Sequence, residues 1–165
     1  MVSVYDVPAN ELIEASADEL KRQNMVKAPE WAVFVKTGVH KARPPVNPDW
    51  WYVRSASVLR TVYLRGPVGV EKLKTLYGGK QRRGHKPAIF ATGSGNIARK
   101  ILQQLEKSGL VASVDKPKKG RKITAKGTAF LDKLATKIMK GEVATKKKES
   151  AEGPAGAKTA KPKSK

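Results

Sequence analysis

Apolar residues recur with the spacing of one helix face along several stretches of the chain. Residues 7–24 form the first of these stretches, and Asp6 precedes them as a candidate N-cap. Residues 29–37 predict a shorter helix that begins at Pro29 and ends before Gly38. The apolar faces of these two helices contain Leu12, Ile13, Leu20, Trp31, Phe34 and Val35.

Residues 50–65 predict a longer helix whose two sides differ in chemistry, with Asp49 as its N-cap and Gly66 at its end. One side is apolar and contains Tyr52, Ala56, Leu59 and Tyr63. The other side contains Trp50, Arg54, Ser57, Thr61 and Arg65, with Arg60 beside it. Guanidinium groups bind phosphates and an indole stacks on bases, so this side is a candidate RNA-binding surface. The alternative is that Trp50 packs into a neighbouring loop and the arginines pair with carbonyl groups or acids.

A glycine-rich basic segment separates the next two predicted helices, residues 68–77 and residues 94–108. We expect this segment, residues 78–93, to be a mobile loop whose glycines let the backbone approach a ligand closely. Its cations, which suit either phosphate binding or a merely solvated loop, are Lys80, Arg82, Arg83 and Lys86. In the second helix Ser94 is the expected N-cap and Gly109 follows the C-terminus. The polar side of that helix carries Arg99 and Lys100.

A short hairpin and a last helix complete the predicted elements. Residues 110–114 and 121–123 have strand character, and Thr124 is placed to cap a helix that runs to about residue 139. The hairpin tip is a third candidate phosphate-binding group, or simply a soluble turn, and contains Lys116, Lys118, Lys119 and Arg121. This order of elements is typical of a winged helix. The predicted fold class is therefore mainly α, a winged-helix-like helical bundle with one small β-hairpin.

The charge of the chain favours a polyanionic partner. Its 165 residues include 34 lysines and arginines against 14 aspartates and glutamates, a formal net charge of +20. Residues 1–40 hold 4 basic and 6 acidic residues, whereas residues 41–140 hold 23 and 5. A field of one sign over the middle of a chain attracts nucleic acid. We expect residues 1–140 to form one domain and residues 141–165, which lack Leu, Ile and aromatic residues, to be a disordered basic tail.

Residue types that carry catalysis or bind metals are scarce. The absence of cysteine excludes disulfides and thiolate metal sites, and the two histidines, His40 and His85, lie in predicted loops without a catalytic framework. The Gly-Ser-Gly at residues 93–95 lacks the spacing of a P-loop. We expect no enzyme, cofactor, metal or small-molecule substrate. The chain has no stretch near the roughly 20 apolar residues of a membrane span and no signal-peptide pattern, which predicts a soluble cytosolic protein.

Three longer motifs resemble those of one protein family. Residues 50–57 read WWYVRSAS, residues 77–84 read YGGKQRRG, and residues 120–124 read GRKIT. With these motifs in this order, the chain resembles the S19e family of eukaryotic and archaeal small-subunit ribosomal proteins over about residues 5–140. The lysine-rich extension beyond residue 140 departs from the shorter members of the family.

The resemblance implies a winged-helix-like protein in the head of the small subunit, one copy per ribosome, that binds ribosomal RNA and neighbouring head proteins and supports subunit maturation. It also implies a location in cytoplasmic ribosomes, with a nucleolar stage if the source is eukaryotic. The motifs assign RNA-binding roles to Trp50, Arg54, Arg60, Arg65, Lys80, Arg82 and Arg83. Together with the charge pattern, the full predicted RNA-binding set adds Ser57, Lys86, Arg99, Lys100, Lys118, Lys119 and Arg121.

Two other classes of binding protein compete with this interpretation. A winged-helix DNA-binding regulator would insert residues 94–108 into a major groove, but the densest positive charge lies outside that helix and no dimerisation helix is evident. A membrane-surface polybasic protein would need a basic amphipathic helix with aromatic anchors, which the sequence lacks.

Overall fold

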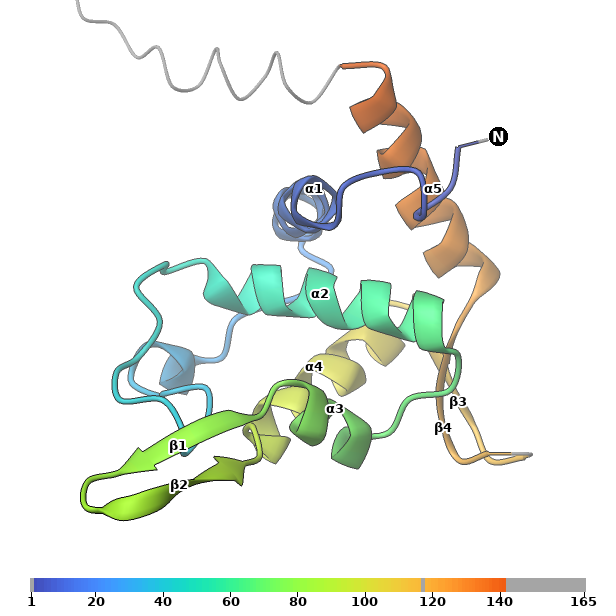
Figure 1. Ribbon diagram of the computed structural model, residues 1–165. Helices are drawn as coiled ribbons and strands as arrows, with labels where there is room; N and C mark the ends of the chain where they lie inside the picture. Colours follow the sequence, from blue (N-terminus) through green and yellow to red (C-terminus); the bar gives the residue numbers. More distant parts are fainter. Residues whose placement is uncertain (1, 117, 142–165) are drawn as a thin grey trace, which may run out of the picture.

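The structure, a computed structural model, describes residues 2–116 and 118–141. Within this part of the chain, five α-helices are joined by a 3-10 turn and two antiparallel hairpins (Figure 1). In chain order the elements are α1 (Ala9–Arg22), η1 (Glu30–Val33), α2 (Trp50–Arg65), α3 (Val70–Leu76), β1 (Gly79–Arg83), β2 (Lys86–Ala91), α4 (Gly95–Lys107), β3 (Val111–Val114), β4 (Gly120–Ile123) and α5 (Ala125–Met139). The mainly α class is confirmed. The predicted disordered tail lies, apart from Gly141, outside the described residues.

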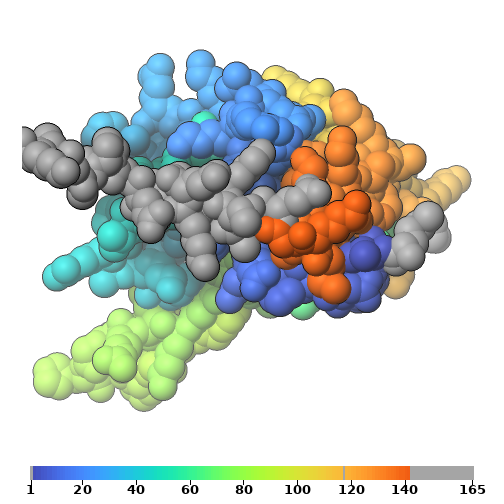
Figure 2. Space-filling view, turned by 90° about the horizontal axis from the view of Figure 1, so that it is seen from above, coloured from blue at the N-terminus to red at the C-terminus, as the bar shows by residue number. Residues whose placement is uncertain are grey.

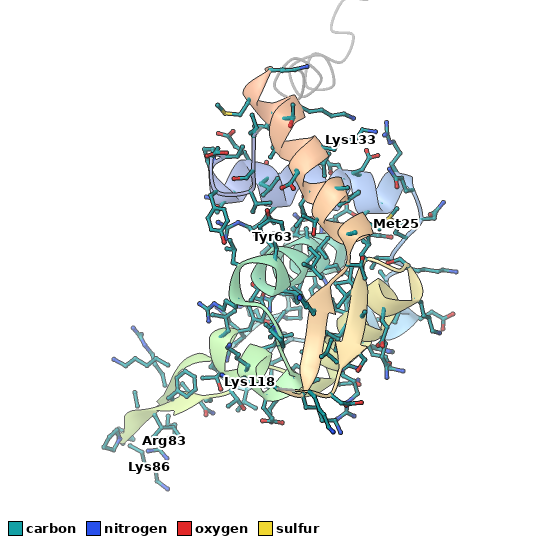
Figure 3. The ribbon with its side chains drawn as sticks, turned by 90° about the vertical axis from the view of Figure 1, so that its right-hand side faces the viewer. Met25, Tyr63, Arg83, Lys86, Lys118 and Lys133 are labelled. Atoms are coloured by element: carbon teal, nitrogen blue, oxygen red, sulfur yellow. The ribbon has the colours of Figure 1, made fainter. Side chains whose placement is uncertain are left out.

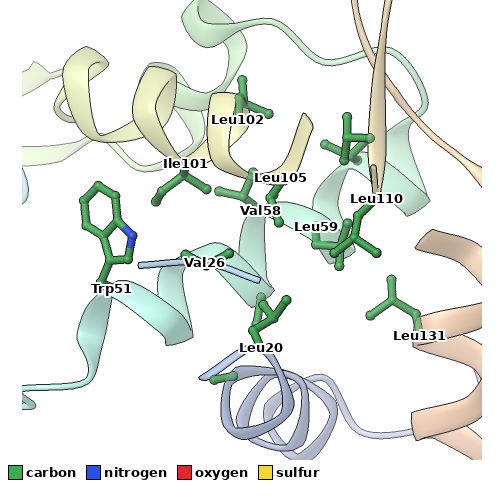
Figure 4. Packing of buried hydrophobic residues seen from close by; sticks show 14 of the residues in the cluster. Leu20, Val26, Trp51, Val58, Leu59, Ile101, Leu102, Leu105, Leu110 and Leu131 are labelled. Carbon is green, nitrogen blue, oxygen red and sulfur yellow. The ribbon is translucent and has the colours of Figure 1, made fainter. Parts of the chain in front are cut away.

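Helix α2 occupies the centre of the fold, with α1 on one side and α4 on the other (Figure 1). Its fully buried side chains include Trp51, Val58, Leu59 and Val62. Figure 4 shows Trp51, Val58 and Leu59 in one cluster with Leu20 of α1, Ile101 and Leu105 of α4, and Leu131 of α5. The helix is therefore packed on more than one side, and few of its positions are left for a ligand.

A hydrogen-bond relay fixes the large indole at the start of this core. Trp51 Nε1 donates to Oε1 of Gln104 at 3.0 Å, and Nε2 of Gln104 donates to the carbonyl oxygen of Lys27 at 2.7 Å. The ring also meets Trp31 and Trp50 edge to face, with centroid distances of 5.5 and 5.3 Å. A buried indole needs a partner for its N–H. This relay supplies one and connects α2, α4 and the segment that follows α1.

The expected starts of the two main N-terminal helices need correction. Asp6 does not cap α1, because its carboxylate accepts hydrogen bonds from the backbone N–H and hydroxyl of Ser3, which lower the pKa of Asp6. Pro8 is the N-cap residue instead. Asp49 does occupy the N-cap of α2, but its carboxylate makes no capping bond and pairs with Nζ of Lys21 at 2.8 Å. At Asp49, an ion pair with Lys21 of α1 takes the place of a capping hydrogen bond. At Asp6, the hydrogen bonds from Ser3 do so.

The short helix expected over residues 29–37 is only the 3-10 turn η1. Its backbone is closed by Ala32 N–H donating to Pro29 and Phe34 N–H donating to Trp31. Trp31 packs on the core as expected, whereas the side chain of Phe34 is 81% exposed. The apolar face predicted there was therefore wrong for Phe34, which follows the last residue of η1 as its C-cap.

The glycine-rich segment 78–93 is a β-hairpin and not the mobile loop that its composition suggested. Strands β1 and β2 pair antiparallel from Gly79–Ala91 to Arg83–Lys86, with an irregularity between Gln81 and Arg83. Gly84 is the first of two turn residues and has a φ of 69°, which matches the positive φ that a type II′ turn requires. The fold therefore contains two hairpins within its described residues, where the sequence predicted one.

The base of this first hairpin is tied to the body. Gly38 and Gly93 form an antiparallel bridge, and Ser94 N–H donates to the carbonyl of Thr37 at 3.0 Å. The imidazole of His40 lies against Gly79, with Cδ2 only 3.0 Å from the position that a Cβ would take there. These contacts hold the root of the hairpin while its turn extends away from the body, as Figure 2 shows for the yellow-green segment.

The predicted helix boundaries of the C-terminal half are confirmed. Ser94 Oγ accepts the Ile97 N–H at 3.4 Å at the start of α4, and Gly109 follows its end with a φ of 74°. Strands β3 and β4 form the predicted second hairpin. Thr124 Oγ1 accepts the Gly127 N–H at 3.2 Å and caps α5. None of the helices described for this chain is long and apolar enough to cross a lipid bilayer.

Replacement of Gly127 tests this packing. A Cβ at residue 127 would overlap the carbonyl oxygen of Leu110 and lie 2.8 Å from Cγ1 of Ile123. Alanine is the better helix former, but overpacking of this kind costs about 1–3 kcal/mol. We expect Gly127→Ala to lower the free energy of unfolding, measured by urea denaturation. Gly69→Ala is the control, because nothing lies within 4 Å of the added carbon. A more stable Gly127→Ala protein would contradict the close contact of Gly127 with Leu110 and Ile123.

Candidate nucleic-acid interface

A cleft of about 680 Å³ opens beside the N-terminal half of α2. Helix α1 contributes Ile13, the segment after η1 contributes Lys41 and Arg43, and Tyr77 closes it from the end of α3. Trp50, Arg54 and Ser57, three members of the predicted RNA-binding set, line the same cleft from α2. The lining of the cleft therefore combines basic and apolar side chains, and it also includes the acidic Glu14 of α1.

Arg54 is held in this cleft by an aromatic ring. Its guanidinium carbon lies 4.1 Å from the centroid of the Tyr77 ring, and the Tyr77 hydroxyl is 2.8 Å from Ser57 Oγ. Burial lowers the pKa of Arg54, and the Tyr77 phenol opposes that shift. An arginine nevertheless stays protonated at physiological pH. The arrangement presents a charged planar group in a fixed orientation, which suits a phosphate at the cleft.

Trp50 does not provide the exposed stacking surface that the sequence suggested. Only 9% of the residue is exposed, and its ring packs edge to face on Trp51. An exposed ring was not found because α2 buries a wider arc than one face, and this arc includes its first turn. Ser57 is likewise engaged, with Tyr77. The alternative placed Trp50 in a neighbouring loop, whereas its ring contact in the structure is with Trp51 of the same helix.

The two remaining α2 arginines differ in exposure. Arg65 is exposed at the C-terminal end of the helix, next to the terminating Gly66. Arg60 is half-buried, and its Nε is buried with no hydrogen-bond partner among the described residues. The predicted RNA-binding side of α2 is thus partly buried around Arg54 and exposed at Arg65.

Within the predicted RNA-binding set, the first hairpin has the highest density of exposed positive charge. Its four cations, all exposed, are Lys80, Arg82, Arg83 and Lys86. Figure 3 shows Arg83 and Lys86 at the far end of the hairpin, away from the helices. Arg83 donates from Nε and Nη2 to the carbonyl oxygen of Pro87, at 3.0 and 2.7 Å, so its guanidinium also helps to close the turn. The hairpin is a basic projection with a defined backbone.

The other predicted residues lie elsewhere on the surface. Arg99 and Lys100 are exposed on α4, and Lys118 and Lys119 are exposed in the turn of the second hairpin. In Figure 3 Lys118 lies well apart from Arg83 and Lys86. Arg121 is half-buried and its Nη2 lies 3.6 Å from Oε2 of Glu106, so it serves in part as a structural residue. The structure therefore distributes the predicted set over a cleft, a projecting hairpin and two separate patches.

Comparisons with known proteins agree in one family. The sequence profile described as ribosomal protein S19e matches residues 3–141. The small ribosomal subunit protein eS19 of Aeropyrum pernix is 49% identical over 148 residues, which cover 88% of this chain and 95% of that protein. The proteins of the same name from Oryza sativa and, as eS19B, from Schizosaccharomyces pombe are 45% and 43% identical, over 82% and 86% of this chain and 92% and 97% of their own lengths.

The chain belongs to the S19e family of ribosomal proteins. The part that matches the family profile includes the α2 cleft and both hairpins, whereas residues 142–165 fall beyond it. Among the described residues of this S19e protein, no group of three or more His, Asp or Glu side chains is arranged to hold a metal ion.

Several residues of the candidate interface had no signal in the sequence. Lys41 and Arg43 lie in a proline-containing segment without periodicity, and Tyr77 ends a short helix. Only the placement of residues 37–47 beside α1 and α2 brings Lys41 and Arg43 to the cleft that Arg54 lines, and only the packing of α3 brings Tyr77 there. Phe90 was likewise unassigned, although its side chain is 58% exposed on β2. In the S19e sequence these residues are separated by too many positions for spacing alone to group them.

Two arginines of α2 give a matched test of the cleft. Arg54 packs on Tyr77, whereas Arg65 is exposed, so Arg54→Ala should lower the free energy of unfolding by about 1–2 kcal/mol through loss of a partly desolvated cation–π contact. Arg65→Ala should leave it unchanged. Urea denaturation of Arg54→Ala, Tyr77→Leu and the double variant should give a coupling of about 1 kcal/mol. Additive effects would show that the ring and the guanidinium do not stabilise one another.

Proposed function

We propose that this S19e protein is a structural component of the small ribosomal subunit, that it binds ribosomal RNA chiefly through the first hairpin, and that it supports maturation of the subunit. The observation that carries the proposal is the group of four exposed cations on a strand pair that extends from the body. Its relatives are named as small ribosomal subunit proteins. Neighbouring head proteins are further proposed partners, with one copy in each ribosome.

Electrostatics supports RNA as the partner of this projection. A protein that neutralises phosphates with lysine and arginine releases condensed counterions, and this release drives binding without sequence readout. Among the described ion pairs, none involves Lys80, Arg82 or Lys86. These charges are available to phosphates. Residues 1–140 would act as one RNA-binding domain, in the cytoplasm and, in a eukaryote, first in the nucleolus.

The DNA-binding alternative would rely on α4. That helix exposes Arg99 and Lys100 in its first half, but it carries fewer cations than the hairpin and its apolar side is fully used by the core. A strand pair that projects from a body can enter folded RNA, where phosphates of different segments converge. We therefore favour RNA, recognised through its backbone and shape.

Removal of the hairpin charges should weaken RNA binding specifically. The variant Lys80→Ala/Arg82→Ala/Lys86→Ala should bind a small-subunit RNA fragment less tightly, and its slope of log K against log salt should fall by about 2 to 3, as expected for three lost phosphate contacts. Filter binding at several salt concentrations measures both quantities. The matched control is Lys107→Ala/Lys133→Ala/Lys140→Ala, which removes three exposed charges from α4, α5 and the residue after α5. Equal loss in both variants would refute a localised interface.

Sedimentation of cell extract tests the role in the particle. The wild-type protein should travel with small subunits and detach after RNase or very high salt, because its contacts with RNA are largely electrostatic. The hairpin variant should shift toward the top of the gradient, while the control variant should stay with the particle. A wild-type protein found on chromatin would instead favour the DNA-binding alternative.

A further inference from the structure

An exposed aromatic ring lies within the most basic part of the molecule. Phe90 is on β2, and its side chain is 58% exposed although the core of this protein is formed elsewhere. A large apolar side chain left in water on a narrow strand pair gives no packing energy to the fold. Its position therefore calls for an explanation other than stability.

The register of the hairpin sorts its side chains into two faces. Residues on a regular strand alternate between faces, and cross-strand partners lie on the same face. Lys80 is directly opposite Phe90, on the root side of the irregularity between Gln81 and Arg83. The aromatic ring thus shares its face with the cation of Lys80. Ile89 and its partner Gln81 are on the other face.

Gly78 holds the ring in place. The Phe90 Cζ is 2.5 Å from the position that a Cβ on Gly78 would occupy, so the ring lies against bare backbone that a side chain would otherwise cover. The tip of the ring lies at this backbone and more than half of Phe90 remains exposed. Figure 2 shows the hairpin extending from the body as a segment that a ligand can approach. The contact at Gly78 restricts the position of the ring.

We propose that Phe90 is a stacking platform for an unpaired RNA base, with Lys80 on a phosphate beside that nucleotide. The proposal rests on the proposed function and adds the kind of RNA: a segment with an unstacked base, such as a bulge or a single strand, and not a continuous duplex. Aromatic side chains stack on unpaired bases, and this contact is tolerant of base identity. The bases of a continuous duplex are already stacked on one another and offer no such surface.

The positive charge of this face favours RNA over a protein as its ligand. An apolar pocket on a protein would accept Phe90 but would leave Lys80 desolvated without a partner, which is costly. A polyanion whose bases are aromatic satisfies both the ring and the cation. The pairing of Lys80 with Phe90 places both chemistries on one face.

Two RNA probes separate stacking from electrostatics. The first is a fluorescein-labelled 12-nucleotide single strand without self-complementarity, and the second is the same strand annealed to its complement. Using the full chain and fluorescence anisotropy, we expect Phe90→Ala to bind the single strand about tenfold or more weakly and the duplex as the wild type does. Phe90→Trp should retain binding. Phe90→Leu is the matched control, because it keeps an apolar side chain without a ring and should lose as much as Phe90→Ala.

The outcomes distinguish the two proposals. If the wild type binds these RNAs and Phe90→Ala or Phe90→Leu binds the single strand equally well, the stacking platform is refuted while the electrostatic interface stands. If the wild type and the triple hairpin variant bind neither RNA at low salt, the proposed function fails as well. If Phe90→Ala binds RNA normally but no longer joins the small subunit, the ring contacts a protein and the platform is refuted. Circular dichroism should be unchanged in each variant, since Phe90 is exposed.

Discussion

Burial of helix α2 is the constraint on which the rest of the structure depends. Trp51 is fully buried at its start, and the relay from its indole through Gln104 to the Lys27 carbonyl joins three segments that are far apart in the chain. Val58, Leu59 and Val62 continue the same contact with α1, α4 and α5 (Figure 4). A chain with a net charge of +20 must offset its own repulsion, and this apolar seam is the main attraction available to do so.

The same packing determines where the positive charge lies. Positions on α2 that face neighbours become half-buried, so Arg54 is stacked on Tyr77 and Arg60 is partly enclosed, while Arg65 at the helix end is exposed. The hairpin has no comparable apolar contact along its strands, and its cations remain in water. The core thus separates fixed, partly desolvated arginines in a cleft from exposed cations on a projection. The two groups suit different contacts with a polyanion: an oriented phosphate in the first case and counterion release in the second.

Helices and their boundaries were predictable because their signals are local. Ser94, Gly109 and Thr124 act at the ends of their helices through contacts within a few residues, as the sequence indicated. The first hairpin was not predictable in this way, since neither of its faces is buried and no alternation of apolar and polar residues marks its strands. Asp49 looks like a cap, but Lys21 competes for its carboxylate from a different helix. Such competition becomes visible only when the two helices are packed together.

In the candidate site, too, local features were predictable from the sequence and contacts between distant segments were not. Composition identified the hairpin cations as a group, but the position of Lys80 opposite Phe90 depends on strand register. The low exposure of Trp50 was missed because helical periodicity gives the direction of a side chain and not the width of the arc that is buried. The segment of residues 37–47, which lines the cleft beside Trp50, has no periodic signal.

The difference between a mobile loop and a hairpin changes the energetics of binding. Strands that are already paired lose less conformational entropy on contact with a ligand than a loop that must first become ordered. The first hairpin is nevertheless under electrostatic stress, because Arg83 and Lys86 are directly opposite one another and like charges in that position are destabilising. Its root is secured by the Gly38–Gly93 bridge and by His40 against Gly79, whereas its tip depends on the turn and on the Arg83–Pro87 hydrogen bonds. A polyanion that neutralises the tip removes this repulsion, so by linkage it also stabilises the strand pairing that presents the cations.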